Sequence, residues 1–375
     1  MNKTRQKFIV LGVCVICIAL GGFGLFQILS GQPEASSISI YQPLGLLMST
    51  FVFLESLGSG SLVASVLEKR EKESTKLALF GLAAMACSGL VVILDLGKPI
   101  DSWRLWFAPN LESPILLDVW FMTFALIFGA ARVVALKKGW SGFRKVTDIG
   151  TIVFAIILPL ATSMIFCSTE GRIGYNTTMT MAVFLVQVAI GGALATLLLT
   201  SNFNETGILS QKGLRTLAAA LLAFNALLVI GELLLASHRG SFESLSLKTI
   251  AFGSYAPVFW IDLILGIMVP ACLLATNKGT KIAAGIGLVG MFLSKFIFVV
   301  RGNAITQYAA LLGDGYYVPV VGDTLDGSWL LNASFPTSNE IMICIATFAL
   351  VIFTTLVLMT IVRPKSLDSS SKTAE

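Results

Sequence analysis

The sequence predicts an all-α integral membrane protein with about ten transmembrane helices. Of its 375 residues, 55% are hydrophobic and 13% are charged, whereas a soluble domain carries roughly twice that charged fraction. Many apolar runs reach the roughly 20 residues that an α-helix needs to cross a hydrocarbon core. The net charge of +5 does not indicate a nucleic-acid partner, because the basic residues lie mainly in predicted loops, where they set topology.

Ten apolar segments are predicted to span the membrane. The first has the position of a signal peptide, but its apolar stretch is long and lacks a small-residue cleavage site, so we expect an uncleaved helix. The segments cover residues 8–29, 43–67, 76–96, 115–136, 146–167, 179–200, 215–237, 255–275, 282–300 and 339–362.

The distribution of Lys and Arg predicts the orientation of these helices. One set of loops and termini holds 19 of the 26 basic residues and the other set holds six, with Lys295 inside a helix. Basic residues are enriched in cytoplasmic loops, so we expect both termini in the cytoplasm. The loops expected on the outer face are 30–42, 97–114, 168–178, 238–254 and 301–338.

A weak internal repeat predicts two four-helix bundles between flanking helices. The segment LESLGSGSLVAS (54–65) aligns with VQVAIGGALATL (186–197) at an offset of 132, which pairs Glu55 with Gln187 and Gly60 with Gly192. More loosely, SPILLDVW (113–120) resembles APVFWIDL (256–263). The two copies run in the same direction, as in parallel repeats of transporters. The alternative is that membrane helices rich in small residues look alike, because such residues favour close packing.

This repeat divides the chain into five parts. They are a first helix with an outer loop (1–42), the first bundle (43–170), the second bundle (171–302), an extracytoplasmic loop (303–338), and the last helix with a cytoplasmic tail (339–375).

The chain has no signature of a cofactor site of its own. Its single histidine is His238, whereas a membrane haem usually takes two axial ligands. The six cysteines are expected to be small packing residues, although Cys14 and Cys17 have CxxC spacing. No ferredoxin pattern, phosphate loop or nucleotide fingerprint is present. Any redox chemistry would therefore use metals held by a partner.

Several ionisable residues lie inside the predicted helices, mostly towards the outer face. A charge in the hydrocarbon core costs at least about 2.5–3.5 kcal/mol, so each needs a physical reason. Any one of these residues, taken alone, could be explained by an ion pair with a structural role or by solvation at the membrane interface. Together they predict a polar cavity that opens outward, whereas Arg132 can snorkel to the cytoplasm. The residues are Glu55, Asp95, Asp118, Glu232, Asp262, Lys295, Arg301 and Glu340.

Four stretches of the chain form a recognisable set. The first is DLGKPIDSWRLW (95–106), followed by SPILLDVW (113–120). The others are FLESLGSGSLV (53–63), FWIDLILGIMVP (259–270), and RGNAITQY (301–308) with FPTSNEI (335–341). Together, in this arrangement, they resemble the ten-helix type of the NrfD/PsrC family, membrane subunits of polysulfide reductase-type respiratory complexes. The first stretch is similar to the family's His-Leu-Gly-Arg-Pro loop, downstream Trp-Arg and Ser-Pro helix start, with Asp95 in place of the family His and Lys98 in place of Arg.

This resemblance implies a subunit that oxidises quinol or reduces quinone, with menaquinone as one candidate, and that binds no cofactor of its own. Such proteins pair with an extracytoplasmic, ferredoxin-type iron–sulfur subunit, which often exchanges electrons with a molybdopterin enzyme or a cytochrome. The expected location is the bacterial cytoplasmic (inner) membrane.

The resemblance also suggests where the quinol head group binds. Asp95 and Asp118 are expected to hydrogen-bond it and accept its protons, although Asp lacks the near-neutral reference pKa of His. Glu55 and Asp262 lie deeper and would pass protons or complete the cavity.

Two further groups of residues complete the expected site. Arg301 would anchor an acid such as Glu340 or stabilise a semiquinone anion, or else it is an interface anchor. The loop above the carboxyls would dock the partner, or else it is an ordinary aromatic belt with positive anchors. Its residues are Lys98, Trp103, Arg104 and Trp106.

Two alternative functions remain open at this point. A secondary transporter also combines parallel repeats with buried acids, but it exposes its site alternately to both faces, whereas these acids lean outward. A proton-translocating form of the same subunit would need a polar route to the inner face, for which Gln187 and Asn225 are candidates.

Overall fold

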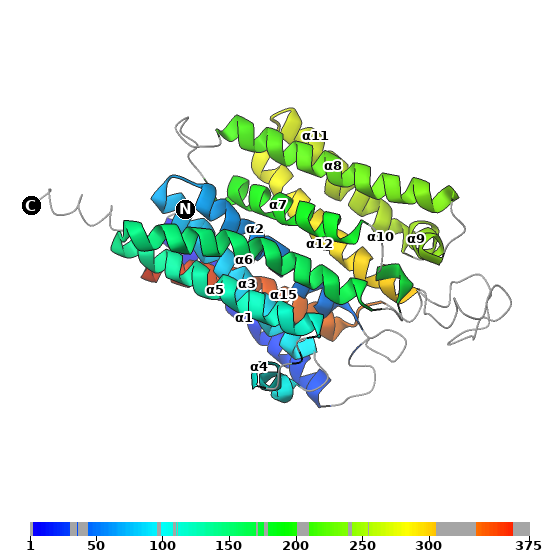
Figure 1. The fold of residues 1–375 in the computed structure, drawn as a ribbon, viewed down its shortest axis with the longest axis horizontal. Helices are drawn as coiled ribbons and strands as arrows, with labels where there is room; N and C mark the ends of the chain where they lie inside the picture. Colours follow the sequence, from blue (N-terminus) through cyan, green and yellow to red (C-terminus); the bar gives the residue numbers. More distant parts are fainter. Residues whose placement is uncertain are drawn as a thin grey trace, which may run out of the picture.

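The computed structural model describes ten helices that are long and apolar enough to cross a membrane. Every regular element in the described part of the chain is helical, as predicted, and the long helices run side by side (Figure 1). The described residues are 3–30, 36, 44–95, 99–107, 110, 112–169, 172–175, 179–200, 210–238, 242–253, 255–304 and 335–362.

The spanning helices agree with the predicted segments, but several begin earlier. Four of them start four or five residues before the apolar run, because their first turns carry charged and polar residues that extend the helix beyond it. These are α1 (Lys3–Leu29), α3 (Glu71–Asp95), α6 (Ser141–Cys167) and α8 (Gln211–His238). The others are α2 (Leu46–Leu67), α5 (Pro114–Lys138), α7 (Thr180–Leu199), α12 (Thr280–Ala304) and α15 (Ser338–Ile361).

The eighth span is interrupted by a π-helix. It consists of α10 (Ala256–Ile261), the π-helical segment η3 (Asp262–Met268) and α11 (Val269–Ala275). Gly266 in this segment packs against Gly290 of α12, and a Cβ on Gly266 would lie 2.5 Å from the Gly290 Cα. Single π-helical turns inside α-helices are frequent at functional sites, and this one begins at Asp262.

In the part of the chain that the structure describes, the short helices between spans lie on one side of the molecule. They are η1 (Pro99–Trp103), α4 (Arg104–Phe107), η2 (Ile173–Tyr175) and α9 (Phe242–Phe252), which connect consecutive spans at the same end of the molecule. We call this end the α4/α9 side. The apolar runs did not predict these helices, because they are short and mixed in composition.

Local signals fix where individual helices start and stop. Pro114 opens α5, where a missing N–H costs nothing, and Gly139 ends that helix in the left-handed conformation (φ 72°). At α15, Thr337 and Glu340 form a capping box, in which each side chain bonds the backbone N–H of the other residue.

The two central helices α2 and α7 cross in backbone contact. A Cβ on Gly60 would overlap the Val188 carbonyl oxygen and lie 2.6 Å from the Gly192 nitrogen. Helices α3 and α6 pack against α2, and α5 packs against both of them, whereas α8 and α12 pack against α7, and α11 packs against both of these. The glycine pair that the internal repeat aligns is therefore one place at which the two groups of helices meet. The predicted residue boundaries of the two bundles stay a prediction.

The first and last spans pack together on the outside of this core. Gly21 of α1 lies against Ala346 of α15, and Gly24 against Asn339, so the two helices are antiparallel. The start of α1 and the end of α15 therefore lie on the same side. Which side faces the cytoplasm stays a prediction from the Lys and Arg distribution.

Candidate functional site

The structure brings two of the predicted acids together around a threonine. Glu55 of α2 and Asp118 of α5 are buried, and Thr162 of α6 lies between them. The Thr162 hydroxyl is 2.5 Å from Asp118 Oδ1, 2.7 Å from Glu55 Oε2 and 3.1 Å from the Leu158 carbonyl oxygen. We call Glu55, Thr162 and Asp118 the carboxyl cluster.

A buried lysine stands beside this cluster. Lys295 of α12 is 1% exposed, and its Nζ lies 3.4 Å from the centroid of the Phe184 ring of α7. Its charge interacts electrostatically with Glu55, but its Nζ makes no hydrogen bond within the described part of the chain. An ammonium group over an aromatic face is stabilised by the ring quadrupole. The sequence predicts Lys295 among the ionisable residues of the polar cavity, but it does not predict a role for this residue at the quinol site.

The second group of helices carries a related but simpler pair. Ser294 of α12 donates a hydrogen bond of 2.6 Å to Asp262. Thr162 and Ser294 are separated by the same 132 positions as Glu55 and Gln187, so the repeat relates the two hydroxyls as well. Gln187 Oε1 and Asp262 Oδ1 are buried without a hydrogen-bond partner among the described residues. Asp262 therefore lies in its own polar site, separate from the carboxyl cluster.

Asp95 and Glu340 form a second acidic group at the α4/α9 side. Asp95 ends α3 and interacts electrostatically with Glu340 at the start of α15. Glu340 is 1% exposed and accepts hydrogen bonds from Ser36 Oγ (2.9 Å) and the Thr337 N–H (3.1 Å). The structure therefore gives Asp95 and Asp118, which were expected to share one head group, different neighbours.

Arg301 is buried in an ion pair between three helices. Its guanidinium lies 2.9 Å from Glu232 Oε1 of α8 and 3.3 Å from Ser246 Oγ of α9. The expected partner was Glu340, whereas the observed ion pair is with Glu232. Nearby, Tyr175 donates a hydrogen bond of 3.0 Å to the Val299 carbonyl oxygen.

Tyr175 lies in η2, outside the spanning helices. Burial raises the pKa of its phenol, and Arg172 opposes this shift only in part. Tyr175 is therefore a neutral hydrogen-bond donor at ordinary pH.

The predicted docking surface is exposed where the structure describes it. Trp103 is 53% exposed and Trp106 is 43% exposed, with Phe107 beside them at 79%. Arg104 lies 3.6 Å from Asp101 and 5.8 Å from the centroid of the Trp103 ring. Lys98, the remaining residue of this prediction, lies outside the described residues.

On the opposite side, Arg132 is enclosed, and the expectation that it snorkels to water is wrong. Its side chain is 0% exposed and lies 2.6 Å from Asp148. It also donates to the Ser65 carbonyl oxygen (2.7 Å) and to Ser74 Oγ (2.9 Å). These bonds join α2, α3, α5 and α6, which gives the guanidinium local partners in place of water.

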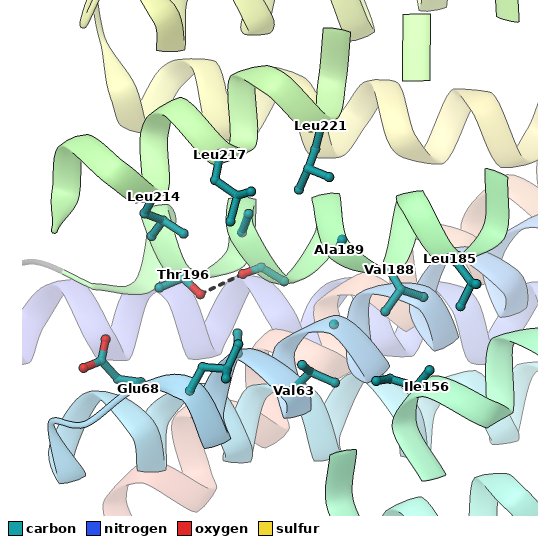
Figure 2. A pocket seen from close by; sticks show the side chains of 15 residues that line it. Val63, Glu68, Ile156, Leu185, Val188, Ala189, Thr196, Leu214, Leu217 and Leu221 are labelled. Carbon is teal, nitrogen blue, oxygen red and sulfur yellow. Dashed lines mark hydrogen bonds between the residues drawn. The ribbon is translucent and has the colours of Figure 1, made fainter. Parts of the chain in front are cut away.

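An apolar cavity of about 350 Å³ lies between α2, α6, α7 and α8, away from the carboxyl cluster (Figure 2). Thr196 at its wall donates its hydroxyl to the Gly192 carbonyl oxygen, so this polar group is already satisfied. Glu68 is the one charged side chain in its lining, which otherwise comprises Gly60, Val63, Ala64, Leu67, Ile156, Leu185, Val188, Ala189, Gly192, Ala193, Thr196, Leu214, Leu217 and Leu221. Apart from Glu68, this lining suits a hydrocarbon chain.

The ten apolar helices define a polytopic membrane protein, and carboxyl groups are buried between its spans. Residues 40–307, from before α2 to the end of α12, match the family described as polysulphide reductase, NrfD. Since this match covers most of the chain, the protein belongs to the NrfD family, as the sequence motifs predicted. The match leaves α1 and α15 outside.

A longer similarity extends over nearly the whole chain. The protein is 24% identical over 389 aligned positions to a Halobacterium salinarum protein described as a "Putative dimethyl sulfoxide reductase membrane subunit". The alignment covers 91% of this chain and 87% of that protein.

Proposed function

We propose that this protein is the membrane-anchor subunit of a respiratory oxidoreductase complex. It exchanges electrons between the quinone pool and an iron–sulfur subunit that docks on the α4/α9 side. Membership of the NrfD family and the description of the Halobacterium salinarum relative as a reductase membrane subunit support this proposal. The chain supplies the binding site and the proton acceptors, and the partner supplies the metal centres.

The observation that carries the proposal is the placement of the buried carboxyl groups. Asp118 lies one turn into α5 from the α4/α9 side, and Glu55 is bridged to it through Thr162. A quinol that gives up electrons must also lose protons, so it needs acceptors within hydrogen-bond reach. Asp118 is suited to bind the head group and accept a proton there, and Asp95 with Glu340 offers a second acidic group nearer the surface.

The docking surface lies on the same side. Exposed aromatic residues and Arg are enriched at protein interfaces, and Trp103, Trp106 and Arg104 combine both types. The Lys and Arg distribution predicts that this side faces away from the cytoplasm. The partner is then an extracytoplasmic ferredoxin-type subunit, which exchanges electrons with a molybdopterin enzyme or a cytochrome, in a bacterial cytoplasmic membrane.

The test is co-purification followed by reduction. The protein is extracted gently from native membranes, and menaquinol is added while the absorbance of the co-purified iron–sulfur centres is followed. We expect the centres to be reduced, and we expect Asp118→Asn to slow reduction at least about 100-fold, the usual minimum contribution of a general base.

The matched control is Glu112→Gln, which removes an exposed acid on the same side and should leave the rate unchanged. Equal rates in Asp118→Asn and wild type would overturn the assignment of Asp118. A protein that purifies alone, does not react with quinol and binds a soluble solute would overturn the whole proposal in favour of a transporter.

A further inference from the structure

The hydrogen bonds of the carboxyl cluster require a carboxyl proton. The Thr162 oxygen lies within bonding distance of three acceptor oxygens, on Asp118, Glu55 and Leu158. A hydroxyl group has one proton to donate and two lone pairs with which to accept. If it donates to one carboxylate, the other carboxyl must donate to it. If it donates to the Leu158 carbonyl, both carboxyls must donate.

The charge of Lys295 limits how many carboxyl protons are present. Two carboxylates that share one site do not both ionise readily, and an isolated buried ammonium is also costly. One carboxylate beside one ammonium is neutral overall. The charged or titratable groups packed here are Glu55 from α2, Asp118 from α5 and Lys295 from α12, whereas α6 and α7 contribute Thr162 and Phe184. Asp262 is engaged separately, with Ser294.

We infer that Glu55, Thr162 and Asp118 form a proton shuttle that stores one carboxyl proton, and that Lys295 is the positioning residue that keeps the negative charge on Glu55. In the resting state the Asp118 carboxylic acid donates to the Thr162 oxygen, and the Thr162 hydroxyl donates to the Glu55 carboxylate. Lys295 interacts electrostatically with Glu55, which favours this arrangement over the reverse.

The shuttle moves charge without changing the number of protons. The Asp118 O–H bond breaks and its proton joins the Thr162 oxygen, while the Thr162 proton passes to Glu55 Oε2. Asp118 becomes the carboxylate and Glu55 the acid. Asp118 is then ready to accept a proton from a quinol hydroxyl, and this last step alone rests on the proposed function.

Infrared spectroscopy of the complex in lipid nanodiscs, without added quinol, tests the inference. A protonated carboxyl gives a C=O band that a carboxylate lacks, and carbon-13 labelling of glutamate shifts only the glutamate bands. In wild type we expect a protonated aspartate band that disappears in Asp118→Asn, and no protonated band from Glu55. In Lys295→Met we expect a new label-sensitive glutamate band, absent from Lys295→Met/Glu55→Gln, because Glu55 loses its counter-charge.

A second pair of variants keeps the inference testable if Lys295→Met does not fold. Thr162→Val removes the bridging hydroxyl and should shift the Asp118 band to higher frequency, as for a carboxyl without a hydrogen bond, whereas Thr162→Ser should keep it. A wild type without the Asp118 band, a Lys295→Met protein without the glutamate band, or identical spectra for Thr162→Val and Thr162→Ser would overturn the inference. Because these spectra need no quinol, they can fail or succeed independently of the proposed function.

Discussion

Gly60 of α2 and Gly192 of α7 lie in backbone contact, and each occupies the space that a Cβ on the other would need. They are 132 positions apart, which is also the separation of Thr162 and Ser294, the two hydroxyls that bond buried aspartates. The two groups of helices thus share related positions at this crossing and at these two hydroxyls. Glu55 in one corresponds to Gln187 in the other.

The glycine contact makes Gly60→Ala destabilising. The added methyl group would overlap the Val188 carbonyl oxygen, and forcing extra atoms into a packed interface costs about 1–3 kcal/mol. Thermal unfolding of the purified protein in detergent should show a lower midpoint. Gly22→Ala in α1 is the control, since nothing lies within 4 Å of its Cβ position. Equal midpoints for the two variants would contradict the contact.

Removing the buried guanidinium of Arg132, on the side opposite α4 and α9, should destabilise the fold more than Gly60→Ala does. Arg132→Met leaves Asp148 without its closest partner and removes the guanidinium bonds to the Ser65 carbonyl and Ser74 Oγ. Breaking a buried pair by removing one partner costs about 3–5 kcal/mol. We expect a lower unfolding midpoint and a lower yield of folded protein than for Arg144→Met, in which the arginine is partly exposed. A small effect for Arg132→Met would mean that its network adds no stability.

The exposed tryptophans near α4 should affect partner binding but not stability. Trp103→Ser with Trp106→Ser removes two large rings from the predicted interface, and truncating an interface hot spot costs at least about 2 kcal/mol. The affinity for the iron–sulfur subunit should fall roughly 30-fold or more in a pull-down titration.

Trp140→Ser supplies the matched control for that experiment. Trp140 has the same exposed fraction as Trp103, 53%, but lies on the opposite side of the molecule. If its loss weakened binding as much as the loss of Trp103 and Trp106, the partner would not be docked at α4.

Glu68 gives a prediction about pH. Partial burial acts to raise its pKa, but hydrogen bonds from Arg70 outweigh burial and lower it below the usual 4.5. A carboxyl whose pKa is lower in the folded than in the unfolded state stabilises the fold above the unfolded pKa, and this contribution disappears as the pH falls through the folded pKa. Wild type should therefore exceed Glu68→Gln in unfolding free energy by up to about 1 kcal/mol at neutral pH.

That difference should begin to fall as the pH drops through the usual pKa of 4.5 and should vanish once the pH is below the lowered pKa of the folded state. Unfolding midpoints of the two proteins, measured across this range, check both its size and its direction. A difference that grows as the pH falls would contradict the pairing of Glu68 with Arg70.

The sequence was sufficient to predict the ten spans, because membrane helices are long apolar runs and their signal is local. Glu55 and Asp118 were also found from the sequence, since an acid inside such a run stands out. The role of Thr162 was not, because threonine is ordinary in a membrane helix and its partners come from α2 and α5. Nor did the sequence predict the bonds of Arg132 with Asp148, which depend on how α5 and α6 are turned towards each other.

The partner of Arg301 also differs between prediction and structure, because it depends on contacts between residues far apart in the sequence. Arg301 and Glu340 both lie near the α4/α9 ends of consecutive spans, which is why Glu340 was one predicted partner of Arg301. In the structure Glu232 of α8 lies closer to Arg301, and Glu340 caps its own helix. Only the packing of α8 and α9 against α12 decides between these partners.

The antiparallel contact of α1 with α15 has a consequence for biosynthesis. Helix α1 leaves the ribosome before the other described spans, yet the helix against which Gly21 and Gly24 pack is made after all of them. Even with α15 in place, only 17% of the apolar window of α1 is buried. A nascent chain that stops before α15 thus lacks the helix that covers Gly21 and Gly24.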